Sequence, residues 1–305
     1  MLGRHAICAL AFTLCALPTH GQTVTEADLQ KRADAVLTLM GFALTPDVTT
    51  GSLAISDQSA GNPYFRQTSI SGGGTLERAL YLEGTLSFGR YDPTFADNEA
   101  GVTQSIQVKW DSVLATGGVG WDFPLARNLV IRPIFNLSLG RVESEARTAP
   151  PATAGRAALE FLRQGQLNAA GVGGSVMLDY ERYGTESDVD VELRYSSIHL
   201  QSFQSSSAVQ GHSLAQTASL WSRLRAPTGW VALERPVRYV LEYAYTRFLG
   251  DLDGALGFSY VNSFGAGLEL DTRRYDAYAS RVRLLLRYKL GGNVTGWAVG
   301  LGASF

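Results

Sequence analysis

The chain has 305 residues, of which 26 are basic and 28 acidic, so its formal net charge is −2. This balance lacks the excess of lysine and arginine that a nucleic-acid surface requires, and it excludes nucleic acid as a partner. Both cysteines, Cys8 and Cys15, lie near the start of the chain. A mature chain without that segment has no disulfide, no thiolate metal ligand and no cysteine nucleophile.

Residues 1–21 have the three parts of a secretory signal peptide. Arg4 gives a short basic start, the apolar stretch "AICALAFTLCAL" follows over 6–17, and the segment ends in "THG". The apolar part is too short for a membrane-spanning helix. The sequence therefore predicts export of the chain, with cleavage after Gly21.

Residues 25–44, "TEADLQKRADAVLTLMGFAL", predict one amphipathic helix at the start of the mature chain. Thr25 is a capping residue with Asp28 placed three positions on, and apolar side chains recur at helical spacing along one face. Those apolar residues are Leu29, Ala33, Val36, Leu37 and Met40. We assign residues 22–48 to this helix and its linker, and residues 49–305 to a separate domain.

From residue 49 onward, apolar and polar side chains alternate with period two in one segment after another. In "DVDVELRY" the split is complete, because Asp188, Asp190, Glu192 and Arg194 all share one parity. The segments are about 12–16 residues long, whereas strands of soluble proteins run to about 5–6 residues. No uninterrupted apolar run of about 18 residues follows residue 21, so the sequence predicts no membrane-spanning helix.

Long strands with one apolar and one charged face predict an all-β protein, a closed antiparallel transmembrane β-barrel. Counting the segments gives twelve strands. The first two, 49–57 and 64–72, alternate weakly, and a ten-stranded barrel is the alternative. Within 104–123 the alternation changes phase near Asp111, which we interpret as a β-bulge. The three longest connections all fall on the side opposite the two termini, as in outer-membrane barrels.

The last residues, "VTGWAVGLGASF", form a strand with one apolar face and one face of small residues. The apolar face consists of Trp297, Val299, Leu301, Ala303 and Phe305. This ending resembles the signal by which the outer-membrane barrel assembly machinery recognises its substrates. A twelve-stranded barrel preceded by one helix resembles the translocator domain of autotransporters. Only residues 22–24 precede the helix after cleavage, so the chain is similar to solitary autotransporter-like barrels, which have no passenger.

The resemblance covers essentially the whole mature chain and rests on architecture and on the C-terminal pattern. It implies a location in the bacterial outer membrane, with outer-membrane lipids and the barrel assembly machinery as partners. The helix over 25–44 is then expected in or under the lumen, where Lys31, Arg32 and Asp34 would meet charged side chains of the wall. The helix would have to move before a solute could pass.

Charged side chains on the inward parity of the later strands predict a charged lumen. The residues that we expect to line it are Asp179, Glu181, Asp188, Asp190, Glu192, Arg194, Arg223, Arg225, Arg238, Glu242, Arg281, Arg283, Arg287 and Lys289. Acidic residues on earlier strands facing basic residues on later ones would give a transverse field in a solute pathway that favours anions. The alternative is that opposite charges pair across the lumen and fill it.

The sequence predicts no catalytic residues, no metal site and no cofactor. His199 and His212 are the only histidines beyond the predicted signal peptide. Ser197 and Ser202 lie near His199, as a phospholipase-type site at the rim would require. An omptin-type protease would draw on the rim residues Asp97, Asp251 and Asp253. The sequence favours a non-enzymatic barrel that is a plugged or gated small-solute pore, with a purely structural or interaction barrel and a rim hydrolase as alternatives.

Overall fold

The structure is a computed structural model, and it describes the greater part of the chain from Asp34 to residue 304. The described residues are 34, 36–38, 40–41, 50–57, 64–76, 79–92, 94–99, 102–146, 165–203, 211–255, 258–271, 281–292 and 294–304. The predicted signal peptide, the plug-helix residues Lys31 and Arg32, and the terminal Phe305 lie outside them.

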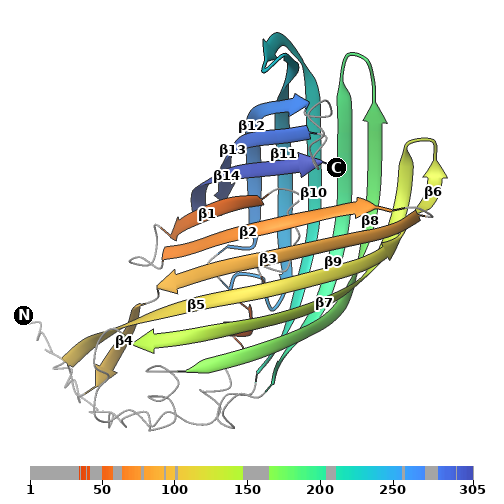
Figure 1. Cartoon of the computed structure of the whole chain (residues 1–305). Helices are drawn as coiled ribbons and strands as arrows, with labels where there is room; N and C mark the ends of the chain where they lie inside the picture. Colours follow the sequence, from red (N-terminus) through yellow and green to blue (C-terminus); the bar gives the residue numbers. More distant parts are fainter. Residues whose placement is uncertain are drawn as a thin grey trace, which may run out of the picture.

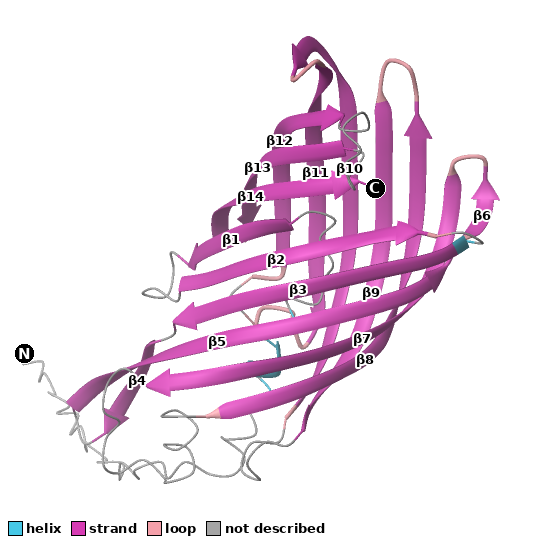
Figure 2. Ribbon diagram, in the orientation of Figure 1, coloured by secondary structure: helices cyan, strands magenta, loops and turns pink. Residues whose placement is uncertain are grey.

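Fourteen strands make up nearly all of the described chain (Figures 1 and 2). They are β1 (Thr50–Asp57), β2 (Tyr64–Thr75), β3 (Leu80–Asp92), β4 (Thr94–Glu99), β5 (Val102–Trp121), β6 (Phe123–Ala126), β7 (Leu129–Ala146), β8 (Gln166–Tyr183), β9 (Asp188–Phe203), β10 (His212–Ala232), β11 (Arg235–Gly250), β12 (Tyr260–Asp271), β13 (Arg281–Gly291) and β14 (Val294–Ser304).

Twelve of these strands close into an antiparallel ring. Strand β1 pairs with β2 on one side and with β14 on the other, and β5 pairs with both β3 and β7. Strand β4 lies outside the ring as a hairpin partner of β5, and the short β6 pairs only with β7. The prediction of a closed twelve-stranded antiparallel barrel is therefore confirmed, and the weakly alternating segments near the start, β1 and β2, are full members of the wall.

The distribution of apolar and charged side chains in the barrel is opposite to that in a soluble protein. Large apolar side chains are exposed around the outside of the ring, including Leu139, Leu284 and Trp297, each more than half exposed. Charged side chains on the opposite parity are buried, including Arg194, Arg225 and Glu242. Because an exposed apolar belt around a polar interior is stable in lipid and not in water, the fold is that of a transmembrane barrel.

Within the described parts of the chain, no helix has the length and apolar character needed to cross a membrane.

The two open ends of the ring differ, and we name them by what they carry. The terminal mouth is the end at which β1 begins and β14 finishes, with Thr50 opposite Leu301. The loop mouth is the other end, which carries the longest connection, 147–165. The sorting of connections by length is weaker than the sequence predicts, because 272–280 at the terminal mouth is as long as the join between β11 and β12 at the loop mouth.

The bulge predicted near Asp111 is absent, and that prediction is wrong. Strand β5 keeps one unbroken register with β3 and with β7 through Asp111. The phase change has another cause, since Trp110 points inward and is buried while Val113 and Val119 face outward. Along β5 the inward-facing residues are apolar at one end of the strand and polar at the other. Where they are apolar, both faces of the strand carry apolar side chains, so the sequence alternation changes phase although the strand contains no extra residue.

A short helix lies inside the ring. Its described residues are Asp34, Val36–Thr38, Met40 and Gly41. The side chains of Val36, Leu37 and Met40 are almost fully buried, although no second helix packs against them in the described part of the chain. Figure 2 shows this segment behind the front strands of the barrel, enclosed by the wall.

Candidate functional site

The lumen is lined by two layers of different chemistry. Near the loop mouth the buried inward residues are apolar, and they come from β5, β7, β8, β9, β10 and β11 and from the connection between β11 and β12. They include Trp110, Leu114, Val142, Leu167, Ala169, Ile198, Leu200, Ala215, Phe248, Leu252 and Phe258. Toward the terminal mouth the buried inward residues are charged, among them Asp188, Arg225 and Glu269. We call these the apolar layer and the charged layer.

The helix lies on the apolar layer. The hydroxyls of Thr38 and Ser213 are 3.1 Å apart, and the backbone N–H of His212 donates to the Asp34 carboxylate at 2.9 Å. A side chain at Gly140 of β7 would collide with the end of Met40. Gly41 lies so close to Leu252 that a Cβ atom there would be 2.7 Å from a methyl carbon of the leucine. The described part of the helix is thus held at the loop mouth by apolar packing and by polar contacts of Thr38 and Asp34.

This position differs from the sequence-based expectation in its chemistry. Lys31, Arg32 and Asp34 of the helix are expected from the sequence to pair with the charged wall. Only Asp34 of these three is described, and it contacts the first residue of β10, His212, at the loop mouth. The apolar stripe explains the position, because Val36, Leu37 and Met40 would be exposed to water or charge anywhere else in the lumen. Burying three such side chains stabilises the packed position by about 5–9 kcal/mol.

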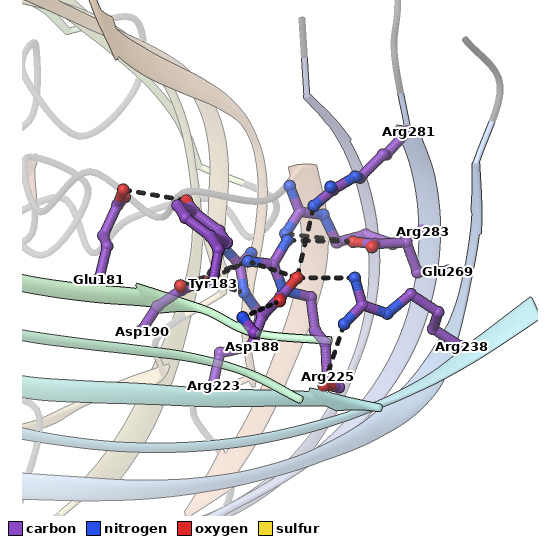
Figure 3. A network of polar contacts seen from close by, with 11 residues as sticks. Glu181, Tyr183, Asp188, Asp190, Arg223, Arg225, Arg238, Glu269, Arg281 and Arg283 are labelled. Atoms are coloured by element: carbon purple, nitrogen blue, oxygen red, sulfur yellow. Dashed lines mark hydrogen bonds and ion pairs between the residues drawn. The ribbon is translucent and has the colours of Figure 1, made fainter. Parts of the chain in front are cut away.

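The largest group of charges in the charged layer surrounds Asp188 and Asp190 on β9 (Figure 3). Arg238 donates to Asp188 at 2.6 Å, and Arg223 donates to Asp190 through its Nε at 2.9 Å. Arg225 lies between the two aspartates and contacts both, at 3.7 Å from Asp188 and 3.0 Å from Asp190. These contacts join β9, β10 and β11 across the inner face of the wall.

A second group of polar contacts spans the lumen between strands that are not neighbours. The two terminal nitrogens of Arg194 on β9 donate to the two carboxylate oxygens of Glu83 on β3, at 2.7 and 2.6 Å. Asn136 donates to the same carboxylate at 2.8 Å and accepts a hydrogen bond from Ser175 at 2.7 Å. Because β5, β7 and β8 lie between β3 and β9 in the ring, the pair is a strut across the bore.

A third group lies beside the turn after β5. Arg132 pairs with Asp122 and, at 3.1 Å, with Asp179, while its guanidinium lies 3.9 Å from the centre of the Tyr81 ring. Thr75 donates to Asp122 at 2.6 Å. Partial burial of Asp122 alone would raise the pKa of its carboxyl, but the hydrogen bonds from Arg132 and Thr75 lower that pKa below its usual value.

The small-residue face of β14 has a structural explanation in the lumen. Arg287 on β13 donates to Glu242 on β11 at 2.7 Å. A Cβ atom at Gly300 would lie 2.3 Å from the Arg287 guanidinium, so only glycine leaves room for that side chain. On the other face of β14, Trp297 and Val299 are exposed to lipid. The side chains of Leu301 and Ala303 lie outside the described part.

Most of the charged residues expected in the lumen are placed on its inner face. Ten are buried or nearly so, and they are Asp179, Asp188, Asp190, Arg194, Arg223, Arg225, Glu242, Arg283, Arg287 and, more weakly, Arg238. Arg281, Glu192 and Lys289 are partly exposed, and Glu181 is exposed and accepts a hydrogen bond from Tyr183. Acidic and basic residues are interleaved in pairs, so the structure has no separate acidic and basic walls among these residues.

Several polar residues of the lumen lie outside the predicted set, and four of them carry a charge or an amide. Glu83, Arg132, Asn136 and Glu269 are all almost fully buried, and each takes part in an ion pair or a hydrogen bond with another lumen residue. The signal for them was present in the sequence, since each lies on the inward parity of its strand. They were missed because each is an isolated charge or amide, whereas the prediction was drawn from strands with runs of charges.

The rim residues considered for catalysis are occupied by other contacts. His199 stacks on His212 with ring centres 6.4 Å apart. Asp251 accepts a hydrogen bond from the backbone N–H of Leu214 at 2.7 Å, and Asp253 pairs with Arg247 at 3.5 Å. The side chain of Asp97 lies outside the described part. Among the described residues, no group of three or more His, Cys, Asp or Glu side chains is placed to hold a metal ion.

Comparison with known proteins gives similarity in three-dimensional structure only. The sequence matches no protein-family profile and no curated protein.

The barrel is similar to autotransporter translocator domains. The β domain of the Bordetella autotransporter BrkA has 13% sequence identity and a TM-score of 0.49, with 85% of this chain and all of that one covered. The translocator domain of NalP from Neisseria meningitidis has 14% identity and a TM-score of 0.47, with 92% and 100% covered. The transport unit of AIDA-I from Escherichia coli has 10% identity and a TM-score of 0.47, with 90% of this chain and 99% of that one covered. These are likenesses of shape, and the fold itself rests on the strand pairings described above.

Proposed function

We propose that the protein is a non-enzymatic outer-membrane barrel whose lumen is closed by the helix over 25–44, and that small solutes pass only when this helix moves. The observation that supports the proposal is the burial of Val36, Leu37 and Met40 against the apolar layer. These apolar side chains of the helix match the wall at the loop mouth chemically. Bacterial barrels of this kind belong to the outer membrane, where the apolar belt faces lipid.

The free energy of packing determines the equilibrium between the barrel with the helix in place and the barrel with the helix displaced. About 5 kcal/mol, the lower figure for burying the three side chains, corresponds to a bias of more than about a thousandfold toward the closed state. Opening therefore requires a force, a ligand or a partner that binds the open state better. The Thr38–Ser213 and Asp34–His212 contacts add to this bias.

Planar-bilayer recording of the barrel without residues 22–44 tests the proposal. We expect a higher single-channel conductance than for the full mature chain, because the apolar layer loses the helix that covers it. The anion preference that the sequence predicts does not follow from the exposed charges, because Glu181 and Glu192 are exposed or partly exposed as well as Arg281 and Lys289. Equal conductance of the two proteins would contradict the plug and would mean that the charged layer already closes the bore.

The second candidate is a purely structural or interaction barrel. The strut between Arg194 and Glu83 favours it, because this pair crosses the bore independently of the helix. Arg287 and Glu242 similarly neutralise each other inside the wall. A barrel whose inner charges are paired in this way gains rigidity from them and needs no solute pathway.

A rim hydrolase is a third candidate that the contacts do not support. The histidines contact each other, and the carboxylate beside them is Asp34, 4.0 Å from the His212 ring. The two described rim aspartates hold the backbone and an arginine. We accordingly propose no catalytic residues. Outer-membrane lipids and the barrel assembly machinery complete the proposed set of partners, the latter through the row that begins at Trp297 and ends at Phe305.

A further inference from the structure

Two carboxyl groups face each other directly across neighbouring strands of the lumen wall. Asp179 of β8 and Glu192 of β9 are opposite one another in the strand register. Residues opposite each other in an antiparallel pair have Cβ atoms about 4.5–5.5 Å apart, and two like charges at that spacing destabilise the pairing. Both residues lie on the inward face of the wall, where Asp179 is almost fully buried and Glu192 is partly exposed.

We propose that Asp179 and Glu192 form a proton-binding site, in which the two carboxyl groups share one proton at neutral pH. The pair then carries a single negative charge and is joined by a hydrogen bond, and it becomes doubly charged only at higher pH. Glu192 is nine residues along β9 from Gln201, the register partner of His212 where the helix is held, or about 30 Å along the strand. The site therefore stands independently of the proposed plug.

The first support is an unused acceptor on Asp179. One oxygen of its carboxyl group, Oδ2, lies 3.1 Å from Nη1 of Arg132. The other oxygen, Oδ1, is inaccessible to solvent and has no hydrogen-bond partner among the described residues, and only 6% of Asp179 is exposed. A buried acceptor without a donor costs free energy, and a protonated Glu192 directly opposite supplies that donor.

The second support is that the basic neighbours of Glu192 are bound to other carboxylates. Three arginines lie near enough to act electrostatically on Glu192, and each forms an ion pair elsewhere. These pairs are Arg132–Asp122, Arg194–Glu83 and Arg223–Asp190. Within the described residues, Glu192 itself makes no hydrogen bond or ion pair. No hydrogen bond from an arginine therefore favours its ionised form, as such bonds do for the other carboxylates.

The remaining titratable groups around the pair have partners of their own. Glu181 and Asp190, the next inward carboxylates of β8 and β9, are also opposite each other, and their charges act on Asp179. Tyr81 of β3 lies near Glu192. The hydrogen-bond partners of Glu181, Asp190 and Tyr81 are Tyr183, Arg223 and Glu83, respectively. Shared protonation is thus specific to the pair whose carboxyl oxygens lack donors.

A metal ion is the other species that two carboxylates commonly share. Hard cations such as calcium take six or more oxygen ligands. Among the described residues, no group of three or more Asp, Glu, His or Cys side chains is placed to hold one. A proton needs only the two oxygens that the register brings together.

Infrared spectroscopy of the mature chain, folded in detergent micelles, tests the proposal through the carbonyl band of a protonated carboxyl group. We expect this band at pH 7 in the unchanged chain. Glu192→Gln and Asp179→Asn should each abolish it, because either substitution leaves one carboxyl group that ionises without repulsion from the other. Glu143→Gln is the matched control and should keep the band, since Glu143 is an exposed carboxylate that pairs with Arg141.

Urea unfolding between about pH 5 and about pH 8 gives a second readout. Both carboxyl groups are ionised in the unfolded chain over this range, so folding takes up one proton. Relative to Glu192→Gln, the ratio of folded to unfolded chain should fall by up to about tenfold per pH unit as the pH rises. The decline should end at the pH at which the infrared band disappears. Glu143→Gln should follow the unchanged chain throughout.

The proposal is overturned if the unchanged chain has no protonated-carboxyl band at pH 7. It is also overturned if either Glu192→Gln or Asp179→Asn keeps the band, because the proton then belongs to one buried residue and is not shared. Heat-modifiable gel migration establishes that each variant is folded. Asp179→Ser takes the place of Asp179→Asn if that variant does not fold.

Discussion

Arg194 on β9 reaches across the bore to Glu83 on β3, and its two terminal nitrogens donate to both oxygens of that carboxylate, at 2.7 and 2.6 Å. Both side chains are almost fully buried. Asn136, Ser175 and Ser196 complete the hydrogen bonds around the pair. The strut ties together two parts of the wall that are separated by three strands, so its effect on stability should exceed that of a pair between neighbours.

Glu83→Gln tests the strut. Removing one partner of a buried ion pair leaves an uncompensated charge, here that of Arg194, and we expect a loss of about 3–5 kcal/mol in the free energy of unfolding. Urea unfolding of the barrel in lipid vesicles measures it. Glu143→Gln is the control, since Glu143 pairs with Arg141 at 2.6 Å but both side chains are about half exposed or more. That control should cost less than about 1 kcal/mol, and equal losses in the two variants would contradict the strut.

Asp122 predicts a dependence of stability on pH. Its folded pKa is lowered by Arg132 and Thr75, while an unfolded aspartate has a pKa of about 3.9. The stabilisation is therefore complete above pH of about 4 and is lost as the pH falls through the folded pKa. Asp122→Asn should be less stable than the unchanged chain at pH 7 and should approach its stability as the pH falls through the lowered folded pKa of Asp122. A difference that stays constant from pH 7 down through the whole acid range in which the barrel remains folded would contradict this linkage.

The fold could be predicted because lipid and a narrow lumen impose a strict rule on every strand. The alternation in β9 follows this rule, with Val191 and Leu193 on one parity and Asp190 and Arg194 on the other. The rule fails where the lumen is apolar. Trp110 is buried inside the apolar layer, and its apolar character on the inward parity imitates a bulge.

The pairing of the charges could not be predicted, because it depends on which strands face each other across the bore. Nothing in the sequence joins Glu83 to Arg194, since they are 111 positions apart. The position of the helix depends likewise on the apolar layer, which is built from single residues of many strands. Sequence periodicity places a residue on a face, but only the closed ring determines what that residue meets.

The turn between β10 and β11 predicts a gain in stability. Leu233 and Glu234 both adopt left-handed backbone conformations, with φ of 51° and 57°. Two-residue hairpin loops of this kind favour Asn-Gly, because other side chains strain the left-handed region by about 1–2 kcal/mol per residue. Replacing the pair by Asn-Gly should raise the free energy of unfolding by about 1–2 kcal/mol. Val231→Asn, which removes an exposed apolar side chain from the adjacent strand, should give no such gain in the same urea titration.

The C-terminal row predicts an effect on assembly. Trp297 and Val299 face lipid, and Phe305, outside the described part, is the last residue of the same parity. Deleting Phe305 should reduce the amount of heat-modifiable barrel in the outer-membrane fraction, because the assembly machinery would lose the end of the row. Trp230→Ala removes an exposed aromatic ring from the β10–β11 hairpin and should leave the amount unchanged. Normal levels without Phe305 would count against the assembly signal.

The helix predicts a graded effect on opening. Leu37 is fully buried against the apolar layer, and Leu37→Ala should weaken the packed position by about 2–5 kcal/mol. That loss corresponds to an increase of about 30- to 4,000-fold in the population with the helix displaced. Single-channel recording should then show brief openings whose level approaches that of the barrel lacking residues 22–44.

Leu139→Ala is the matched control for this recording, since Leu139 has the same side chain but faces lipid on the outside of β7. It should leave the current of the full chain unchanged. If Leu37→Ala lowers the thermal stability of the barrel without producing openings, the helix is a fixed part of the core. The apolar layer would then serve to anchor it, and the barrel would be the structural module that the Arg194–Glu83 strut favours.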